Sequence, residues 1–450
     1  MAINRTDVTR RGVLGSSVIL IAGCTASDPD DQADDERGLD LDGTSDNGGD
    51  DANSADDESR DDETMADWPK YGENRPELDQ IYPTYHGTFI DSGEPTDVFE
   101  DIQEWLASGD ITSDTDYRFT NSQSLAYEGG SGSIFREFQR EPLDLSGKDL
   151  SLAGFFRHDV DSVSSFYVIA EAPDQANRIV WRARYFPTTG WERFDLTPVA
   201  TDGDPDRSNI RKLELDGEHP YGDTTVFNVD DLRLHPRPER GKIMLLFEDC
   251  RRIHYDEYRH VLAEYDYPGT EAVHQELVRS SHSGRMSNWQ VQALYDGGWE
   301  VCATRPDSPW QLSEEVFREE IRDQLDWFDT YDFEWGTNTF MYPYGVPDSH
   351  HLEVLGTHFD LAFTGKGRCT NYSLTNPLTL PKFDTTNGIE ETKEVIDRAA
   401  EYRSVGVLRF KDDYNRSEFS EIIGHIAAAG DDLNVIAPSE LAAYAWEAGT

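Results

Sequence analysis

The chain has 450 residues, with 89 acidic side chains against 40 basic ones and a formal net charge of −49 at pH 7. This length allows two domains and a tail. So large a negative charge excludes nucleic acid as a partner, because like charges repel. At molar salt the Debye length falls to roughly 3 Å, which screens that repulsion. The composition is typical of a halophilic protein whose acidic surface is an adaptation to the solvent.

The first 24 residues are arranged like an export signal. The pair Arg10 and Arg11 precedes an apolar run over residues 13–22, and the sequence Ile-Ala-Gly-Cys ends at Cys24. The run is shorter than the roughly 18 apolar residues that a membrane span requires. This order resembles a Tat-type lipoprotein signal, and the resemblance implies lipid on Cys24 and a membrane-anchored protein on the outer face of the cytoplasmic membrane. A chance arginine pair before an apolar patch is the alternative.

Residues 25–82 are predicted to form a disordered acidic tether. Up to about residue 67 this segment consists mainly of Asp, Glu, Ser, Gly and Asn, with almost nothing to bury. Such a composition stays disordered and extends by self-repulsion. We expect the tether to hold the folded part of the chain away from the membrane.

Residues 83–236 show short alternating runs separated by turn residues. This pattern is typical of strands in an antiparallel β-sandwich. The strand candidates are 133–138, 149–156, 165–170, 178–186 and 226–230. Segments 142–147, 190–196 and 229–234 resemble those of jelly-roll, carbohydrate-binding modules, and this resemblance implies a polysaccharide or glycan as partner.

Two groups of side chains in this region have alternative interpretations. Aromatic side chains could stack on sugar rings or lie in the core, as they more often do in strands; they are Trp181, Tyr185, Phe186 and Trp191. Asp230 and Asp231 could hold a structural calcium ion or lie in a solvated turn.

Residues 237–450 follow a Pro- and Arg-rich boundary at 236–241 and alternate between strand and helix patterns. This alternation predicts a parallel α/β barrel. Helices are expected after Ser313, where Glu314 and Glu315 begin an amphipathic pattern, and from Ser417. The strand candidates are 243–247, 299–303, 339–342, 361–364, 404–410 and 433–437.

An apolar run over residues 243–247 ends in two adjacent acids, Glu248 and Asp249. The run reads as a strand covered on both faces. Sites in parallel α/β folds lie at the carboxyl ends of strands. Two acids there can divide the work, one binding a cation and one moving a proton. A solvated strand end in an acidic protein is the alternative.

The order of short motifs in this half is informative. They are Leu-Phe-Glu-Asp-Cys at 246–250, Tyr-Pro-Gly-Thr at 267–270, Gly-Trp-Glu-Val-Cys-Ala at 298–303, Tyr-Pro-Tyr-Gly at 342–345, Leu-Arg-Phe-Lys-Asp-Asp at 408–413 and Ile-Ala-Pro-Ser-Glu-Leu at 436–441. Together they resemble the NodB-homology domain of the polysaccharide deacetylase family over about residues 240–450. The resemblance implies a distorted (β/α) barrel, a divalent metal such as zinc, and hydrolysis of acetyl groups from carbohydrate by a water nucleophile.

The same resemblance implies roles for individual residues. Glu248 falls on the general base and Asp249 on a metal ligand. The backbone N–H of Tyr344 falls on the group that stabilises the oxyanion. Lys411, between Phe410 and Asp412, falls on the catalytic histidine, and it donates a proton less readily than histidine near neutral pH.

Three departures make the metal weak or absent in this prediction. Thr304 and Ser308 stand where the family has metal-binding histidines, and Met341 stands where it has an arginine. Neutral hydroxyls are poor ligands for zinc, so Asp249 remains alone. Two hypotheses therefore stay open: a metal-dependent deacetylase, and a non-catalytic glycan-binding pseudo-enzyme.

Other residues could rebuild a metal site. Asp249, Cys302 and Asp307 are one conceivable ligand set, and His254 follows the first motif. Alternatively, Cys250 and Cys302 form a disulfide, since exported proteins meet oxidising conditions, which leaves Cys369 unpaired. Three further histidines are predicted to be surface residues and not ligands: His350, His351 and His358.

Overall fold

The structure is a computed structural model that describes residues 93–130, 133–157, 164–185, 191–218, 225–279, 284–305, 312–343, 349–364, 367–411 and 414–449. The predicted export signal with Cys24 and the predicted tether over 25–82 lie outside the described residues. All described residues belong to one compact unit of the chain. Within the described ranges, no helix is long and apolar enough to span a membrane.

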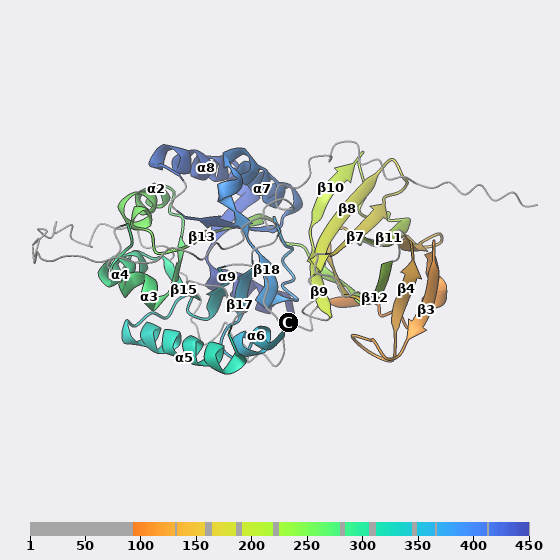
Figure 1. The fold of residues 1–450 in the computed structure, drawn as a ribbon. Coiled ribbons are helices and arrows are strands. Elements are labelled where there is room, and N and C mark those ends of the chain that lie inside the picture. The colour runs from red at the N-terminus through yellow and green to blue at the C-terminus, as the bar shows by residue number, and fades with distance from the viewer. Residues whose placement is uncertain are drawn as a thin grey trace, which may run out of the picture. The chain divides into compact units, whose positions relative to one another are not determined.

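The N-terminal part is an antiparallel β-sandwich of two sheets (Figure 1). The strands of the first sheet lie in the order β3 (Asp110–Asp114), β4 (Ser124–Gly129), β12 (Thr225–Pro236), β6 (Lys148–Phe156) and β9 (Glu192–Leu196), with β1 (Glu94–Asp97) also paired to β12. The second sheet has the order β10 (Pro198–Asp202), β8 (Arg178–Tyr185), β7 (Ser164–Glu171), β11 (Lys212–Glu218), β5 (Ser133–Glu137) and β2 (Leu106–Ala107). A short 3₁₀ turn, η3 (Ile102–Glu104), precedes β2.

The sandwich core is built from alternate side chains of facing strands. Leu150 and Leu152 of β6 meet Phe166 of β7 and Trp181 of β8 in one buried cluster. This alternation is the period of a pleated strand with one buried face. Trp181 is fully buried, so its core interpretation is correct. The side chain of Tyr185 and all of Phe186 lie outside the described residues, whereas Trp191 is half-buried.

The C-terminal part is a nearly closed barrel of parallel strands (Figure 1). Around the sheet the order is β18 (Leu380–Pro381), β17 (Leu361–Thr364), β16 (Thr339–Met341), β15 (Glu300–Thr304), β14 (Thr270–Val273), β13 (Gly241–Phe247), β20 (Val405–Phe410) and β19 (Phe383–Asp384), and β21 (Leu433–Ile436) also pairs with β13. Only Lys382 separates β18 from β19, so the two ends of the sheet meet at this residue. These two architectures confirm the predicted fold class.

Helices surround the barrel sheet. They are α2 (Arg259–Ala263), α3 (Gln275–Arg279), α4 (Asn288–Asp296), α5 (Glu314–Thr330), α6 (Ser349–Leu355), α7 (Ile389–Tyr402), α8 (Arg416–Ala428) and α9 (Pro438–Gly449). A π-helical turn, η4 (His254–Tyr258), leads into α2, and the 3₁₀ turns are η6 (Pro377–Thr379), η7 (Thr385–Asn387) and η8 (Gly430–Asp432). Figure 1 shows α7 and α8 on one side of the sheet, and α5 and α6 on the opposite side.

The helix starts follow capping chemistry. Ser313 accepts a hydrogen bond from the backbone N–H of Val316, which confirms it as the cap of α5. Helix α8, expected from Ser417, begins at Arg416, and its cap is Asn415, whose side chain forms a reciprocal capping box with the Glu418 side chain.

The apolar side chains of β13 pack on both faces of the barrel sheet. Ile243, Leu245 and Phe247 pack in the cluster shared with the helices, whereas Met244 and Leu246 belong to the cluster inside the barrel. Since side chains alternate along a strand, the register that places Leu246 inside the barrel also directs residue 248 inward. In β20, Val405 and Val407 belong to the interior cluster. The same register directs residues 409 and 411 inward at the same end of the barrel.

A loop before η6 joins the barrel to the sandwich. Asp195 accepts hydrogen bonds from Oγ of Ser373 at 2.7 Å and from Oγ1 of Thr375 at 2.6 Å. The Asn371 amide donates to the carbonyl oxygen of Leu150 at 2.7 Å. Burial raises the pKa of Asp195, and the loop hydroxyls oppose that rise. The loop that leads to β18 and Lys382 is therefore held in place by the sandwich.

Candidate ligand-binding site at the mouth of the barrel

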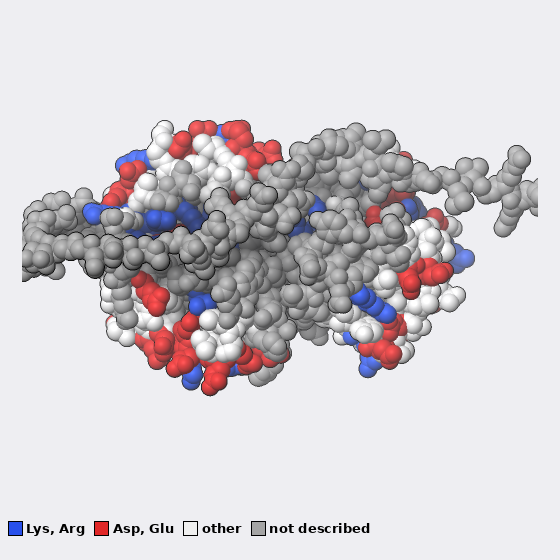
Figure 2. Space-filling view, in the orientation of Figure 1, with Lys and Arg blue, Asp and Glu red and all other residues white. Residues whose placement is uncertain are grey.

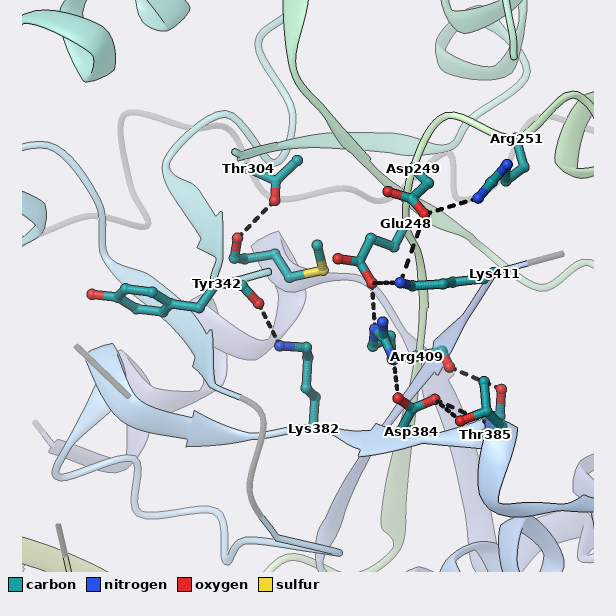
Figure 3. A network of polar contacts seen from close by, with 12 residues as sticks. Glu248, Asp249, Arg251, Thr304, Tyr342, Lys382, Asp384, Thr385, Arg409 and Lys411 are labelled. Atoms are coloured by element: carbon teal, nitrogen blue, oxygen red, sulfur yellow. Dashed lines mark hydrogen bonds and ion pairs between the residues drawn. The ribbon is translucent and has the colours of Figure 1, made fainter. Parts of the chain in front are cut away.

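Glu248 and Asp249 lie at the carboxyl end of β13, as predicted (Figure 3). Asp249 and Cys250 have φ angles of 74° and 50°, a left-handed conformation that non-glycine residues rarely adopt. The turn is fixed from outside: Met286 N–H donates to the carbonyl oxygen of Cys250 at 2.7 Å, and the Arg285 guanidinium donates to that of Asp249. Backbone strain of this kind persists where the surroundings over-determine it, and it is concentrated at functional sites.

The Glu248 carboxylate is buried in an ion pair. It is 3% exposed, and its Oε2 accepts a hydrogen bond from Nε of Arg409 on β20. The Arg409 guanidinium also donates to Asp384 at the end of β19 (Figure 3). The atom that the family resemblance assigns to proton abstraction therefore already accepts a hydrogen bond from a permanently charged guanidinium.

The ammonium group of Lys411 lies between the two neighbouring acids. Its Nζ is 3.6 Å from Oε2 of Glu248 and 3.7 Å from Oδ2 of Asp249. A positive charge at this distance from two carboxylates does part of what a shared metal cation would do. The structure thus brings together the three predicted site residues that it describes; Tyr344 lies outside the described residues.

His254 supports Lys411 from the buried side. Its Nε2 is 3.1 Å from the carbonyl oxygen of Lys411, and its Nδ1 is 2.9 Å from Oε2 of Glu271. A carbonyl can only accept, so Nε2 carries a hydrogen. Burial raises the pKa of Glu271, which favours its protonated form. A protonated Glu271 can donate a hydrogen bond to Nδ1 of His254. His254 lies in the π-helical turn η4, a local widening that is often found at functional sites.

The site residues that the structure describes do not fit a divalent metal. The Thr304 hydroxyl donates to the backbone carbonyl of Met341 at 2.8 Å, and Met341 is buried inside the barrel. Asp249 contacts Nη2 of Arg251 at 3.3 Å in addition to Lys411. Across the described residues, no group of three or more His, Cys, Asp or Glu side chains could hold a metal ion. Ser308 and Asp307 lie outside the described residues.

Lys382 closes the barrel at the seam between β18 and β19. It is 3% exposed, and its Nζ donates to the carbonyl oxygen of Tyr342 at 2.6 Å. Burial lowers the pKa of Lys382 to about 7. The Tyr342 ring points away from this contact (Figure 3). Sequence reasoning missed Lys382, Arg409 and Asp384; the only usable signal was that residue 409 shares the strand face of Lys411.

The cysteine alternatives are not realised. Cys250, Cys302 and Cys369 are all free, so the predicted disulfide between the first two is wrong. Cys250 and Cys302 lie in different apolar clusters, one beside the helices and one inside the barrel, which explains why they do not pair. Burial raises the pKa of both thiols, so neither is a ready thiolate ligand.

The histidines after the Tyr-Pro-Tyr-Gly motif differ from their predicted exposure. His351 is only 1% exposed and packs edge-on against Phe317 of α5, so its prediction as a surface residue is wrong. The apolar face of α5 covers it, which periodicity along α6 alone did not reveal. His358 is half-buried, and burial lowers its pKa. The side chain of His350 lies outside the described residues.

The two acids predicted as a calcium site in the sandwich have other partners. Asp230 accepts from the backbone N–H groups of Phe119 and Thr120, both at 2.9 Å. Asp231 forms ion pairs with the guanidinium groups of Arg193 and Arg233. Both carboxylates are buried, so the solvated-turn alternative is also wrong. They brace a bulge in β12 and do not fit a calcium ion.

An aromatic cluster lies on the outer side of the first sandwich sheet. Phe155 of β6 alternates with the core residue Phe156 and therefore points outward. Its ring lies 5.6 Å from that of Tyr117 and 5.8 Å from that of Trp191. Tyr117 is 47% exposed. Phe155 stacks on the Tyr117 ring and the Arg157 guanidinium lies 4.5 Å from its centre, so the exposed part of this cluster, and not a bare ring face, is what a sugar could contact.

Comparison with known proteins finds partial similarity of fold. No family model and no curated protein matches the chain. A Streptococcus pyogenes deacetylase, PplD, solved with acetate, is 19% identical over 31% of this chain and 62% of its own, with a TM-score of 0.29. The Xyl-CE4 domain of a xylanase from the hindgut metagenome of Trinervitermes trinervoides is 14% identical over 45% of this chain and 90% of its own, with a TM-score of 0.33.

The sandwich has similar structures of its own. A family 11 carbohydrate-binding module from Clostridium thermocellum, solved with a mixed-linked tetrasaccharide, is 15% identical over 32% of this chain and 95% of its own, with a TM-score of 0.25. Each similarity is to part of the fold, and the chemistry of the site depends on its own residues.

Proposed function

We propose that this protein binds a glycan at the cell surface and does not carry out metal-dependent deacetylation. The observation that carries the proposal is the position of the Lys411 ammonium between Glu248 and Asp249, at 3.6 Å and 3.7 Å. A divalent ion at this point would have to displace the ammonium, and within the described part of the site it would find one carboxylate, Asp249, that is not buried in the Arg409 ion pair. A single carboxylate does not hold a transition metal against water.

The sandwich is the second part of the proposed glycan-binding surface. Tyr117, Phe155 and Trp191 form a cluster of stacked and tilted rings on its outer face. Aromatic faces provide apolar contact area at low conformational cost, and sugars present C–H faces to them. Neutral glycan segments are therefore expected to bind here.

The proposal includes export and anchoring. The twin-arginine sequence and Cys24 favour a lipid-anchored protein, with residues 25–82 as the tether, 83–236 as the sandwich and 237–450 as the barrel. The acidic composition favours a halophilic source. Substitution Cys24→Ser is expected to release the protein from the membrane fraction; retention there would contradict lipid anchoring.

Deacetylation remains the second candidate, because Glu248 and Asp249 occupy the carboxyl end of β13. Protein purified in molar KCl should contain far less than one metal ion per chain and release no acetate from acetylated chito- or xylo-oligosaccharides. It should bind oligosaccharides, and Tyr117→Ala should weaken this binding, whereas Tyr265→Ala, at a distant exposed tyrosine, should not. Stoichiometric metal that is lost in Asp249→Ala, together with acetate release, would overturn the proposal.

A further inference from the structure

We propose that Asn415, at the start of α8, is an attachment site for an N-linked glycan. The tripeptide Asn-Arg-Ser at 415–417 has the pattern Asn-X-Ser/Thr that marks such sites in exported proteins. The inference rests on the proposed export of the chain, because sugars are transferred to this pattern outside the cytoplasm. It concerns a modification of the protein itself and does not depend on the glycan that the protein binds.

The described residues contain two tripeptides of this pattern, and the structure separates them. The other is Asn-Tyr-Ser at 371–373. Asn371 is 1% exposed, and its amide nitrogen donates to the carbonyl oxygens of Leu150 at 2.7 Å and of Leu196 at 3.2 Å in the sandwich. The nitrogen to which a sugar would be joined is therefore buried and already bonded.

Asn415 presents the same nitrogen to solvent. The residue is exposed, and its Oδ1 accepts hydrogen bonds from the backbone N–H groups of Ser417 at 2.9 Å and Glu418 at 3.1 Å. Because the oxygen and the nitrogen of an amide lie on opposite sides of its carbon, an oxygen that faces the helix directs Nδ2 away from it. Among the described residues, this Nδ2 has no hydrogen-bond partner.

The chain on both sides of Asn415 is held in place. The carbonyl oxygen of Tyr414 accepts a hydrogen bond from the Tyr258 hydroxyl at 2.5 Å, and the Tyr414 hydroxyl donates to the carbonyl of Thr385. The backbone N–H of Asn415 donates to Oε2 of Glu418 at 3.0 Å. Red acidic atoms lie over α8 in Figure 2, so the helix that follows has a solvated outer face. A sugar chain at Asn415 can therefore extend into solvent without displacing a buried contact.

The export route makes exposure in the folded state decisive. The proposed Tat-type signal belongs to a route that carries folded proteins, so the transferase meets the folded chain. The sequence pattern alone accepts both tripeptides. In the folded chain only Asn415 offers an accessible amide nitrogen, whereas Asn371 is covered by the sandwich.

The transfer is a substitution at the anomeric carbon of an activated sugar. The donor is an oligosaccharide joined through phosphate to a membrane lipid, and the cell supplies both the donor and its transferase. Nδ2 of Asn415 forms a bond to the anomeric carbon, the bond from this carbon to the phosphate oxygen breaks, and the lipid phosphate leaves with the electron pair. One amide hydrogen is lost as a proton. Since Oδ1 is unchanged, the modified side chain still caps α8.

Peptide mass spectrometry of the full-length protein tests the inference. The host is a halophilic cell that glycosylates an exported reporter carrying Asn-Arg-Ser in an unstructured tail. The peptide with Asn415 should carry the mass of an oligosaccharide, and the peptide with Asn371 should not. Asn415→Asp removes the nitrogen and Ser417→Ala removes the hydroxyl that the pattern requires, so both variants should lose this mass. Ser417→Thr should retain it.

Both variants that lose the sugar keep the cap of α8. Asp caps helices as well as Asn does, and the backbone N–H of residue 417 remains a donor in Ser417→Ala. Exported protein with an unmodified Asn415, a glycan on Asn371, or a glycan that persists in Ser417→Ala overturns the inference and leaves the proposed glycan binding intact. Protein that stays in the cytoplasm overturns the proposed export, and the inference with it. Cell fractionation and peptide masses distinguish these two failures.

Discussion

Nε2 of His254 lies 3.1 Å from the carbonyl oxygen of Lys411, so a buried histidine supports the backbone of the residue that the sequence resemblance assigns to the position of a catalytic histidine. The imidazole also bonds Glu271 of β14 at 2.9 Å and thereby connects β14 to the end of β20. Lys411 is thus supported on its backbone by His254 and surrounded at its ammonium group by Glu248 and Asp249.

His254→Leu should lower the free energy of unfolding by roughly 1–3 kcal/mol, because Glu271 and the Lys411 carbonyl lose a buried partner. Thermal unfolding in molar KCl measures this loss. His425→Leu, at a half-exposed histidine on α8, is the control. An unchanged free energy of unfolding in His254→Leu would contradict this supporting role.

The Arg409–Glu248 pair should behave as a buried ion pair. Arg409→Leu leaves Glu248 buried without its guanidinium and should cost roughly 3–5 kcal/mol of stability. In the double variant Arg409→Leu with Glu248→Leu the stranded charge is gone, and we expect part of the loss to be recovered. Chemical or thermal unfolding of the single and double variants measures both effects. If the double variant were no more stable than Arg409→Leu, the pair would not be coupled.

Glu248, Asp249 and Lys411 could be located from the sequence because each lies in a short local pattern. The apolar run of residues 243–247 predicted a strand that is covered on both faces. Because the end of such a run is clear in the sequence, it also located Glu248 at the end of the strand. The family motif then located Lys411. Its role and those of Glu248 and Asp249 stay predictions, whereas their proximity is observed.

The partners of these residues could not be located in the same way. Arg409 and Glu248 are 161 residues apart in the chain, and periodicity says nothing about such pairs. Lys382 lies between two strands of two residues each, too short to produce a pattern. Burial of His351 depends on the tertiary packing of α5 against α6. Long-range contacts of this kind are decided by the closed barrel and not by local sequence.

Asp360 should make stability depend on pH. Burial raises its pKa to about 6, while the Asn338 amide donates to its Oδ2 at 2.7 Å. The native state therefore holds the proton more tightly than the unfolded chain, and this contribution to stability is lost as pH rises through about 6. Relative to wild type, Asp360→Asn should be more stable at pH 7.5 than at pH 4.5, by roughly 1–2 kcal/mol because the group is only partly buried. The measurement is the difference in stability between the two proteins, taken from melting curves at each pH. Groups that both proteins share titrate alike in both, so their contribution drops out of this difference. A constant difference would contradict the raised pKa.

Lys382 should produce the opposite dependence at higher pH. Burial lowers its pKa to about 7, so between this value and the ordinary range of a lysine the unfolded chain binds the extra proton. Stability contributed by Lys382 therefore increases as pH rises above about 7. Lys382→Met removes the group, and its stability relative to wild type should fall by roughly 2 kcal/mol between pH 6 and pH 9. Lys393→Met, at a half-buried lysine of α7 with two carboxylate partners, should show no such trend in this range. A flat difference for Lys382→Met would mean that the amine stays charged at the seam of the barrel.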